Sequence, residues 1–135
     1  MSSLSVLIID DASMFGKSAR NFLLRYQGIK AVELAADIEE AQGKVCSMRP
    51  EVIFVNREML QKDGYSFCRM LKKKFSGAKI IVLSTFQEEG GFLLPWLNRE
   101  EVCFDGAIAK ESFGASCLPL LISLFPDFVL DRPEE

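Results

Sequence analysis

Residues 51–56 read EVIFVN, and this short stretch decides the fold. From Glu51 to Val55 it is rich in β-branched and aromatic residues and has almost no polar face, which is typical of a strand buried on both sides. Pro50 breaks the chain just before it. A strand of this kind belongs to a parallel sheet covered by helices on both faces, so strands and helices should alternate along the rest of the chain.

The flanking sequence shows that alternation. Short apolar runs alternate with longer stretches whose apolar residues recur every three or four positions, the spacing of a helix. The pattern predicts one doubly wound α/β domain with a parallel five-stranded sheet and helices on both faces, a (βα)5 arrangement. We expect strands at 5–9, 30–35, 51–55, 79–83 and 104–109, and helices at about 13–26, 37–48, 64–75, 87–98 and 112–125.

Length and charge limit the function. A chain of 135 residues suits one compact domain, which we assign to residues 1–125, followed by a short tail at 126–135. The net charge of −3 argues against a nucleic-acid-binding surface, and we interpret the basic run at 72–74 as the solvated end of a helix. No apolar run approaches the roughly 20 residues of a membrane span, and the N-terminus does not resemble a signal peptide, so we expect a cytoplasmic protein.

Cysteine and histidine usage argues against an enzyme. The four cysteines show no C-x-x-C spacing, and histidine is absent, which removes most zinc-site patterns and the usual base for a catalytic thiol. We interpret Cys46, Cys68 and Cys117 as small core residues in a reducing compartment, with Cys103 just before a strand.

Polar residues follow four of the predicted strands directly. Ligands of a doubly wound sheet bind at the carboxyl ends of its strands, so these residues should share one rim. The rim combines two carboxylates, an amide, hydroxyls and an ammonium group. Its members are Asp10, Asp11, Asn56, Ser84, Thr85 and Lys110.

The order of these motifs resembles the receiver domain of two-component response regulators, a flavodoxin-like, CheY-like fold. The resemblance rests on VLIIDD at 6–11, PEVIFVNREMLQKDG at 50–64, the pair ST at 84–85 and GAIAK at 106–110, and it spans about residues 4–125. It implies phosphotransfer from a histidine kinase to an aspartate, assisted by Mg²⁺.

The resemblance also implies a role for each rim residue. Asp10 and Asp11 match the acidic pair that binds magnesium, and Glu58 matches the residue whose backbone carbonyl completes that site. Ser84 matches the switch hydroxyl, and Lys110 matches the lysine that contacts the phosphoryl group. Asn56 occupies the position of the phosphate-accepting aspartate.

Asn56 is the decisive departure from the family. An amide is a poor nucleophile, and a hard cation prefers a carboxylate, so phosphotransfer should be lost and the Mg²⁺ site, formed by Asp10, Asp11, Asn56 and Glu58, should be weak. We expect Lys110 to pair with Asp10 or Asp11 instead. There are three further departures. Leu60 and Glu111 stand where the family commonly has prolines, and Ala107 stands where it has an aromatic switch residue.

Three functions compete at this point. The first is a phosphorylation-independent pseudo-receiver, a non-enzymatic protein-interaction module. The second is an ordinary phosphorylatable receiver whose native aspartate is replaced by Asn56, because the sequence leaves open whether Asn56 is natural or introduced. The third, a flavodoxin-like enzyme or nucleotide binder, is disfavoured because residues 10–18 (DDASMFGKS) contain no glycine-rich phosphate loop.

The resemblance also predicts the partner surface. Receivers contact signalling proteins, either a histidine kinase or a downstream partner, through the face formed here by the helix at 87–98, the strand at 104–109 and the helix at 112–125. Many receivers also form homodimers through this face.

Overall fold

The computed structural model describes residues 3–61, 64–85 and 104–128. Within them lie five strands in one parallel sheet, ordered β2-β1-β3-β4-β5. The strands are β1 (Leu4–Ile9), β2 (Ile29–Ala35), β3 (Val52–Asn56), β4 (Lys79–Ser84) and β5 (Gly106–Ala109). This confirms the predicted fold class, including the near-complete burial of β1, β3 and β4.

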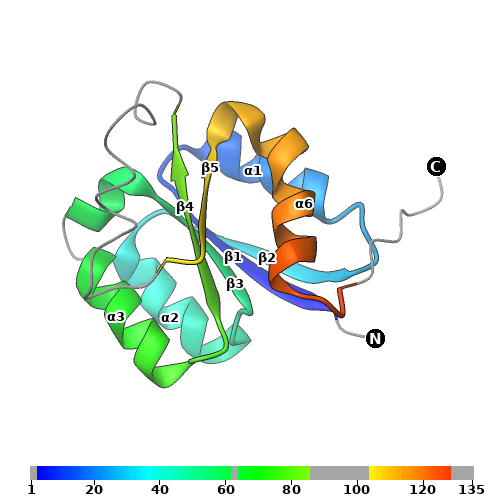
Figure 1. Cartoon of the computed structure of the whole chain (residues 1–135). Coiled ribbons are helices and arrows are strands. Elements are labelled where there is room, and N and C mark those ends of the chain that lie inside the picture. Colours follow the sequence, from blue (N-terminus) through cyan, green and yellow to red (C-terminus); the bar gives the residue numbers. More distant parts are fainter. Residues whose placement is uncertain (1–2, 62–63, 86–103, 129–135) are drawn as a thin grey trace.

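Helices cover both faces of the sheet (Figure 1). The first face carries α1 (Ser13–Leu23) and α6 (Phe113–Leu124), and the second carries α2 (Ile38–Met48) and α3 (Gly64–Lys74). Two short 3₁₀ helices, η1 (Arg57–Gln61) and η2 (Lys110–Ser112), directly follow β3 and β5. The predicted helix at 87–98 lies outside the described residues.

Alternate residues of the central strands fill two separate cores. Val52 and Phe54 of β3 face α1 and α6, whereas Ile53 and Val55 face α2 and α3. This alternation explains why the stretch lacks a polar face: both sides of the strand are removed from water. Phe128, in the predicted tail, is also buried in the first core.

The prediction that all three described cysteines are core residues was wrong for Cys46. Cys68 and Cys117 are fully buried, but Cys46 is exposed. The buried stripe of α2 runs through Ala41 and Val45, and the residue after Val45 turns away from the sheet. An apolar residue in an amphipathic helix does not by itself fix the side on which it lies.

Candidate functional site

The sheet brings the strand-end residues to one edge. Ile9 of β1 pairs with Val55 of β3, so Asp10 and Asn56 end neighbouring strands. Ser84 of β4 pairs with Ala109 of β5, which places Lys110 one residue beyond that pair. Along the chain, β2 is added on one side of β1 and β3 on the other side. The carboxyl ends of β1 and β3 therefore lie at the topological switch point, where doubly wound sheets bind ligands.

Asp10 is the centre of the cluster, and its carboxylate is almost completely buried. Its Oδ1 accepts hydrogen bonds from the backbone N–H of Ala12 at 2.9 Å and from Nδ2 of Asn56 at 3.0 Å. Its Oδ2 lies 2.6 Å from Nζ of Lys110. Two hydrogen-bond donors and one ammonium group, on three different segments, therefore compensate one buried negative charge.

The amide of Asn56 is held in one orientation. Its Nδ2 donates to Asp10, and its Oδ1 accepts from the backbone N–H of Glu58 at 3.3 Å. The reverse orientation would bring two oxygens together at Asp10 and two donors together at Glu58. The side chain is buried, so both interactions are protected from water.

Lys110 closes the cluster from the other side. Its side chain is about one-fifth exposed, and its ammonium group pairs with Asp10 and lies 5.2 Å from the centre of the Phe15 ring of α1. A cation at this distance from an aromatic face is attracted by the ring quadrupole. The predicted pairing of Lys110 with an acid of the first strand is confirmed, and the partner is Asp10.

The remaining predicted residues lie outside this hydrogen-bonded cluster. Asp11 and Glu58 are exposed, and Glu58 contributes only its backbone N–H. Ser84 is fully buried, and its Oγ has no hydrogen-bond partner among the described residues. The structure therefore brings Asp10 into direct contact with Asn56 and with Lys110.

Comparison with known proteins identifies the arrangement. A family model of the response regulator receiver domain matches residues 6–92, more than half of the chain. The chain belongs to the response regulator receiver family. The receiver match agrees with the strand order and with the position of the acidic and basic residues at one sheet edge.

Curated relatives of this receiver are longer proteins. A protein-glutamate methylesterase/protein-glutamine glutaminase of Syntrophus aciditrophicus is 33% identical over 110 residues, covering 82% of this chain and 31% of that protein. One from Myxococcus xanthus is 32% identical over 83 residues, covering 62% of this chain and 24% of that protein. The chain thus spans less than a third of the relatives' length, and the activities in their names are those of the relatives.

Solved structures agree with the receiver fold. A chain in the crystal structure of the P1 domain of CheA3 with CheY6 from R. sphaeroides is 29% identical, with a TM-score of 0.79, over 93% of this chain and 99% of that chain. A two-component response regulator from Clostridium difficile is 21% identical, with a TM-score of 0.74, over 93% of this chain and 98% of that chain.

Receiver domains generally bind Mg²⁺ at this edge, but the side chains here do not fit that ion in their present arrangement. Oδ1 of Asp10 already accepts two hydrogen bonds, Oδ2 is paired with the Lys110 ammonium group, and Asn56 points its amide nitrogen toward Asp10. Across the described residues, no three acidic or thiol side chains form a group that could hold a metal. The Asn56 amide and Lys110 supply the compensation that a cation would otherwise provide.

Some features of the receiver site could not be found from the sequence pattern. Phe15 lies within a helix, and its contact with Lys110 depends on how α1 rotates against the sheet. Away from that site, at the amino ends of β4 and β5, an ion pair joins Lys72 of α3 to Asp105 at 2.7 Å, and Asp105 also accepts from the backbone N–H of Ile80. Only residues placed at strand ends carry a positional signal.

In the described parts of the chain, no helix is both long and apolar enough to cross a membrane.

Proposed function

We propose that this chain is a receiver module that acts by protein contact and not by phosphorylation of residue 56. The observation that supports this proposal is the hydrogen bond from Nδ2 of Asn56 to Asp10. A receiver in use for phosphotransfer needs a nucleophilic oxygen at this position, whereas an amide nitrogen occupied in donating to Asp10 offers none.

The charge balance of the site supports the same conclusion. Asp10 carries the buried negative charge, and Lys110 at 2.6 Å balances it directly. An incoming phosphoryl group would need Lys110 for its own oxygens, and a magnesium ion would need the oxygens of Asp10. Both would have to break the pair first, so Mg²⁺ binding should be weak and phosphoryl transfer unfavourable.

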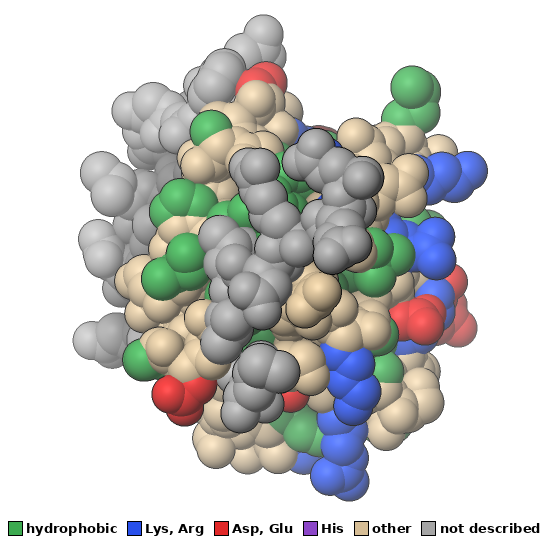
Figure 2. All heavy atoms as spheres, turned by 90° about the vertical axis from the view of Figure 1, so that its right-hand side faces the viewer, with side chains coloured by type: hydrophobic (Ala, Val, Ile, Leu, Met, Phe, Trp, Pro, Cys, Tyr) green, Lys and Arg blue, Asp and Glu red, His purple; other side chains and the backbone are tan. Residues whose placement is uncertain are grey.

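The module would then act in cytoplasmic signalling by presenting one fixed surface to a partner protein. Receivers contact histidine kinases or phosphotransfer domains, and a kinase or a downstream protein is the partner class we propose here. The proposed contact face includes β5 and α6, where Ile122 is 45% exposed. Figure 2 shows hydrophobic side chains at the surface on the side that carries α6. A homodimer would use the same face, and the predicted helix at 87–98 that would complete it lies outside the described residues.

One observation favours a second candidate. Asp10, Asp11, Ser84 and Lys110 are all present at the sheet edge, so an aspartate at position 56 would complete the set of residues of a phosphorylatable receiver. In that case Asn56 would be a replacement that locks an otherwise competent site. The chain would then accept a phosphoryl group from a histidine kinase once the aspartate is present.

Intact mass spectrometry separates the two candidates. The native chain and an Asn56→Asp variant are incubated with Mg²⁺ and acetyl phosphate, and an Asn56→Ala variant serves as the control that lacks any acceptor. No phosphoryl gain on any protein supports the pseudo-receiver. A gain on the aspartate variant alone supports the second candidate, and a gain on the native chain refutes the proposal.

A further inference from the structure

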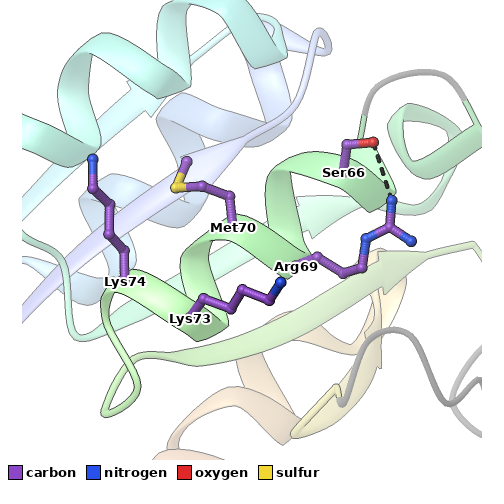
Figure 3. Close-up of a pocket in the computed structure, with 5 residues that line it drawn as sticks. All are labelled: Ser66, Arg69, Met70, Lys73 and Lys74. Carbon is purple, nitrogen blue, oxygen red and sulfur yellow. Dashed lines mark hydrogen bonds between the residues drawn. The ribbon is translucent and has the colours of Figure 1, made fainter.

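The outer face of α3 carries a shallow basic groove that is widely open to solvent. It is a hollow of about 470 Å³ lined by side chains that recur at three- and four-residue spacing along the helix (Figure 3). Its lining residues are Ser66, Arg69, Met70, Lys73 and Lys74. Neither the sheet-edge cluster nor the proposed contact face on β5 and α6 uses any of these residues.

The positive charge of this α3 groove is not balanced locally. The side chains of Arg69, Lys73 and Lys74 form no ion pair with an acidic residue in the described parts of the chain. Lys72, by contrast, turns away from the groove and pairs with Asp105 at 2.7 Å. The basic run at 72–74 is therefore divided: one lysine is a structural partner, and the next two residues are exposed.

The helix dipole explains only part of this arrangement. A cation in the last turn of a helix is stabilised by the unpaired carbonyl groups there, which accounts for Lys73 and Lys74. Arg69 lies earlier in α3, beyond the reach of that effect. Its guanidinium donates to Oγ of Ser66 at 3.4 Å, which directs it along the groove (Figure 3).

Some basic residues elsewhere are accompanied by acids. Lys44 of α2 lies 3.6 Å from Glu33 and 3.4 Å from Glu40. Figure 2 shows Lys and Arg side chains along one margin of the face that carries α1 and α6, with Asp and Glu side chains among them. The α3 groove gathers three cations without a paired acid among the described residues, on a chain whose net charge is −3.

Met70 is the apolar residue among those that line the groove. It is half-buried, because part of its side chain packs against the core that faces α2 and α3. Methionine adapts its shape to an apolar partner, and arginine binds carboxylates in a bidentate manner. An occupant that matches these groups carries carboxylates on either side of one apolar side chain.

We propose that the α3 groove binds an acidic segment of a partner protein, with two or three carboxylates around one apolar residue. From residue 66 to residue 74 a helix rises roughly 12 Å, a length that a short peptide spans. Nucleic acid or an anionic membrane is an extended anion that would also face the negatively charged remainder of the chain, which opposes its binding. A peptide needs only the local charge and the apolar contact.

The test is an amide chemical-shift titration of the full chain. The probe is a short synthetic peptide with glutamates on both sides of a central leucine, and a glutamine version of the same peptide is its control. The test variant combines Arg69→Gln with Lys73→Gln. The matched control combines Lys17→Gln with Arg20→Gln, an exposed pair at similar spacing on α1 at the opposite face of the sheet.

The proposal expects saturable shifts confined to residues 64–74 with the glutamate peptide and none with the glutamine peptide. Binding should weaken at least about tenfold in the α3 variant and by less than about twofold in the α1 control. Shifts spread over α1, or equal weakening in both variants, would refute the α3 site. Tighter binding of a DNA oligonucleotide than of the peptide would overturn the proposal in favour of nucleic acid, and tighter binding of anionic vesicles would overturn it in favour of lipid. Concentration-dependent shifts of α3 without peptide would identify a second copy of this chain as the occupant.

Discussion

Replacing Asn56 by aspartate tests the closed cluster most directly. The change keeps the size of the side chain but removes the donor to Asp10 and adds a second buried carboxylate. Two carboxylates that share a site cannot both ionise without cost, so the folded state should hold a proton or attract a cation. The structure allows the size of this effect to be worked out.

The distance from Nδ2 of Asn56 to Oδ1 of Asp10 is 3.0 Å. Two unit charges at that distance repel by roughly 5 kcal/mol if the effective dielectric constant is about 20. Lys110, at 2.6 Å from the other oxygen of Asp10, offsets part of this repulsion. With the lost hydrogen bond included, the variant should be less stable than the native chain by about 2–4 kcal/mol without metal.

Thermal unfolding with a chelator and with Mg²⁺ measures this difference. For a chain of this size, the expected loss lowers the Tm of the variant by roughly 10 °C in chelator. Saturating Mg²⁺ should restore about 2–3 kcal/mol to the variant and nothing measurable to the native chain. The pKa of the new carboxyl should be raised in the folded state, so the deficit should shrink as the pH falls toward about 4. A variant as stable as the native chain in chelator would refute the reasoning.

Three further predictions concern the folded state. Lys110→Met leaves a buried carboxylate unpaired and should cost about 2–4 kcal/mol, measured by urea unfolding. Gly64→Ala would press a methyl group against the Met59 backbone carbonyl and should lower the Tm sharply, whereas Gly43→Ala on α2 meets open space and should raise stability by about 0.5–1 kcal/mol. Burial raises the pKa of the Cys68 thiol to about 12, so at pH 8 iodoacetamide should modify Cys46 and spare Cys68, as peptide mass mapping would show.

The sequence predicted the sheet and the meeting of Asp10, Asn56 and Lys110 because these follow from position alone. Residues that directly follow parallel strands share an edge, whatever the rest of the chain does. The exposure of Cys46 and the contact of Phe15 with Lys110 depend instead on the rotation of a helix against the sheet. The rotation of a helix is set by the packing of many side chains. The periodicity of apolar residues predicts the buried face of the helix only to within about one residue.

Ser84 gives a last test of how far this site has departed from a switching receiver. Its hydroxyl is fully buried and has no hydrogen-bond partner among the described residues, a state that costs about 1–3 kcal/mol. If no later state of the protein uses that hydroxyl, Ser84→Ala removes the cost and should stabilise the native chain by about 1 kcal/mol. Chemical denaturation measures the change, and Ser84→Val controls for the extra volume that the closed core cannot accept. A loss of stability in Ser84→Ala would mean that the hydroxyl has a partner in solution, and the site would then retain a switch that the closed cluster of Asp10, Asn56 and Lys110 does not explain.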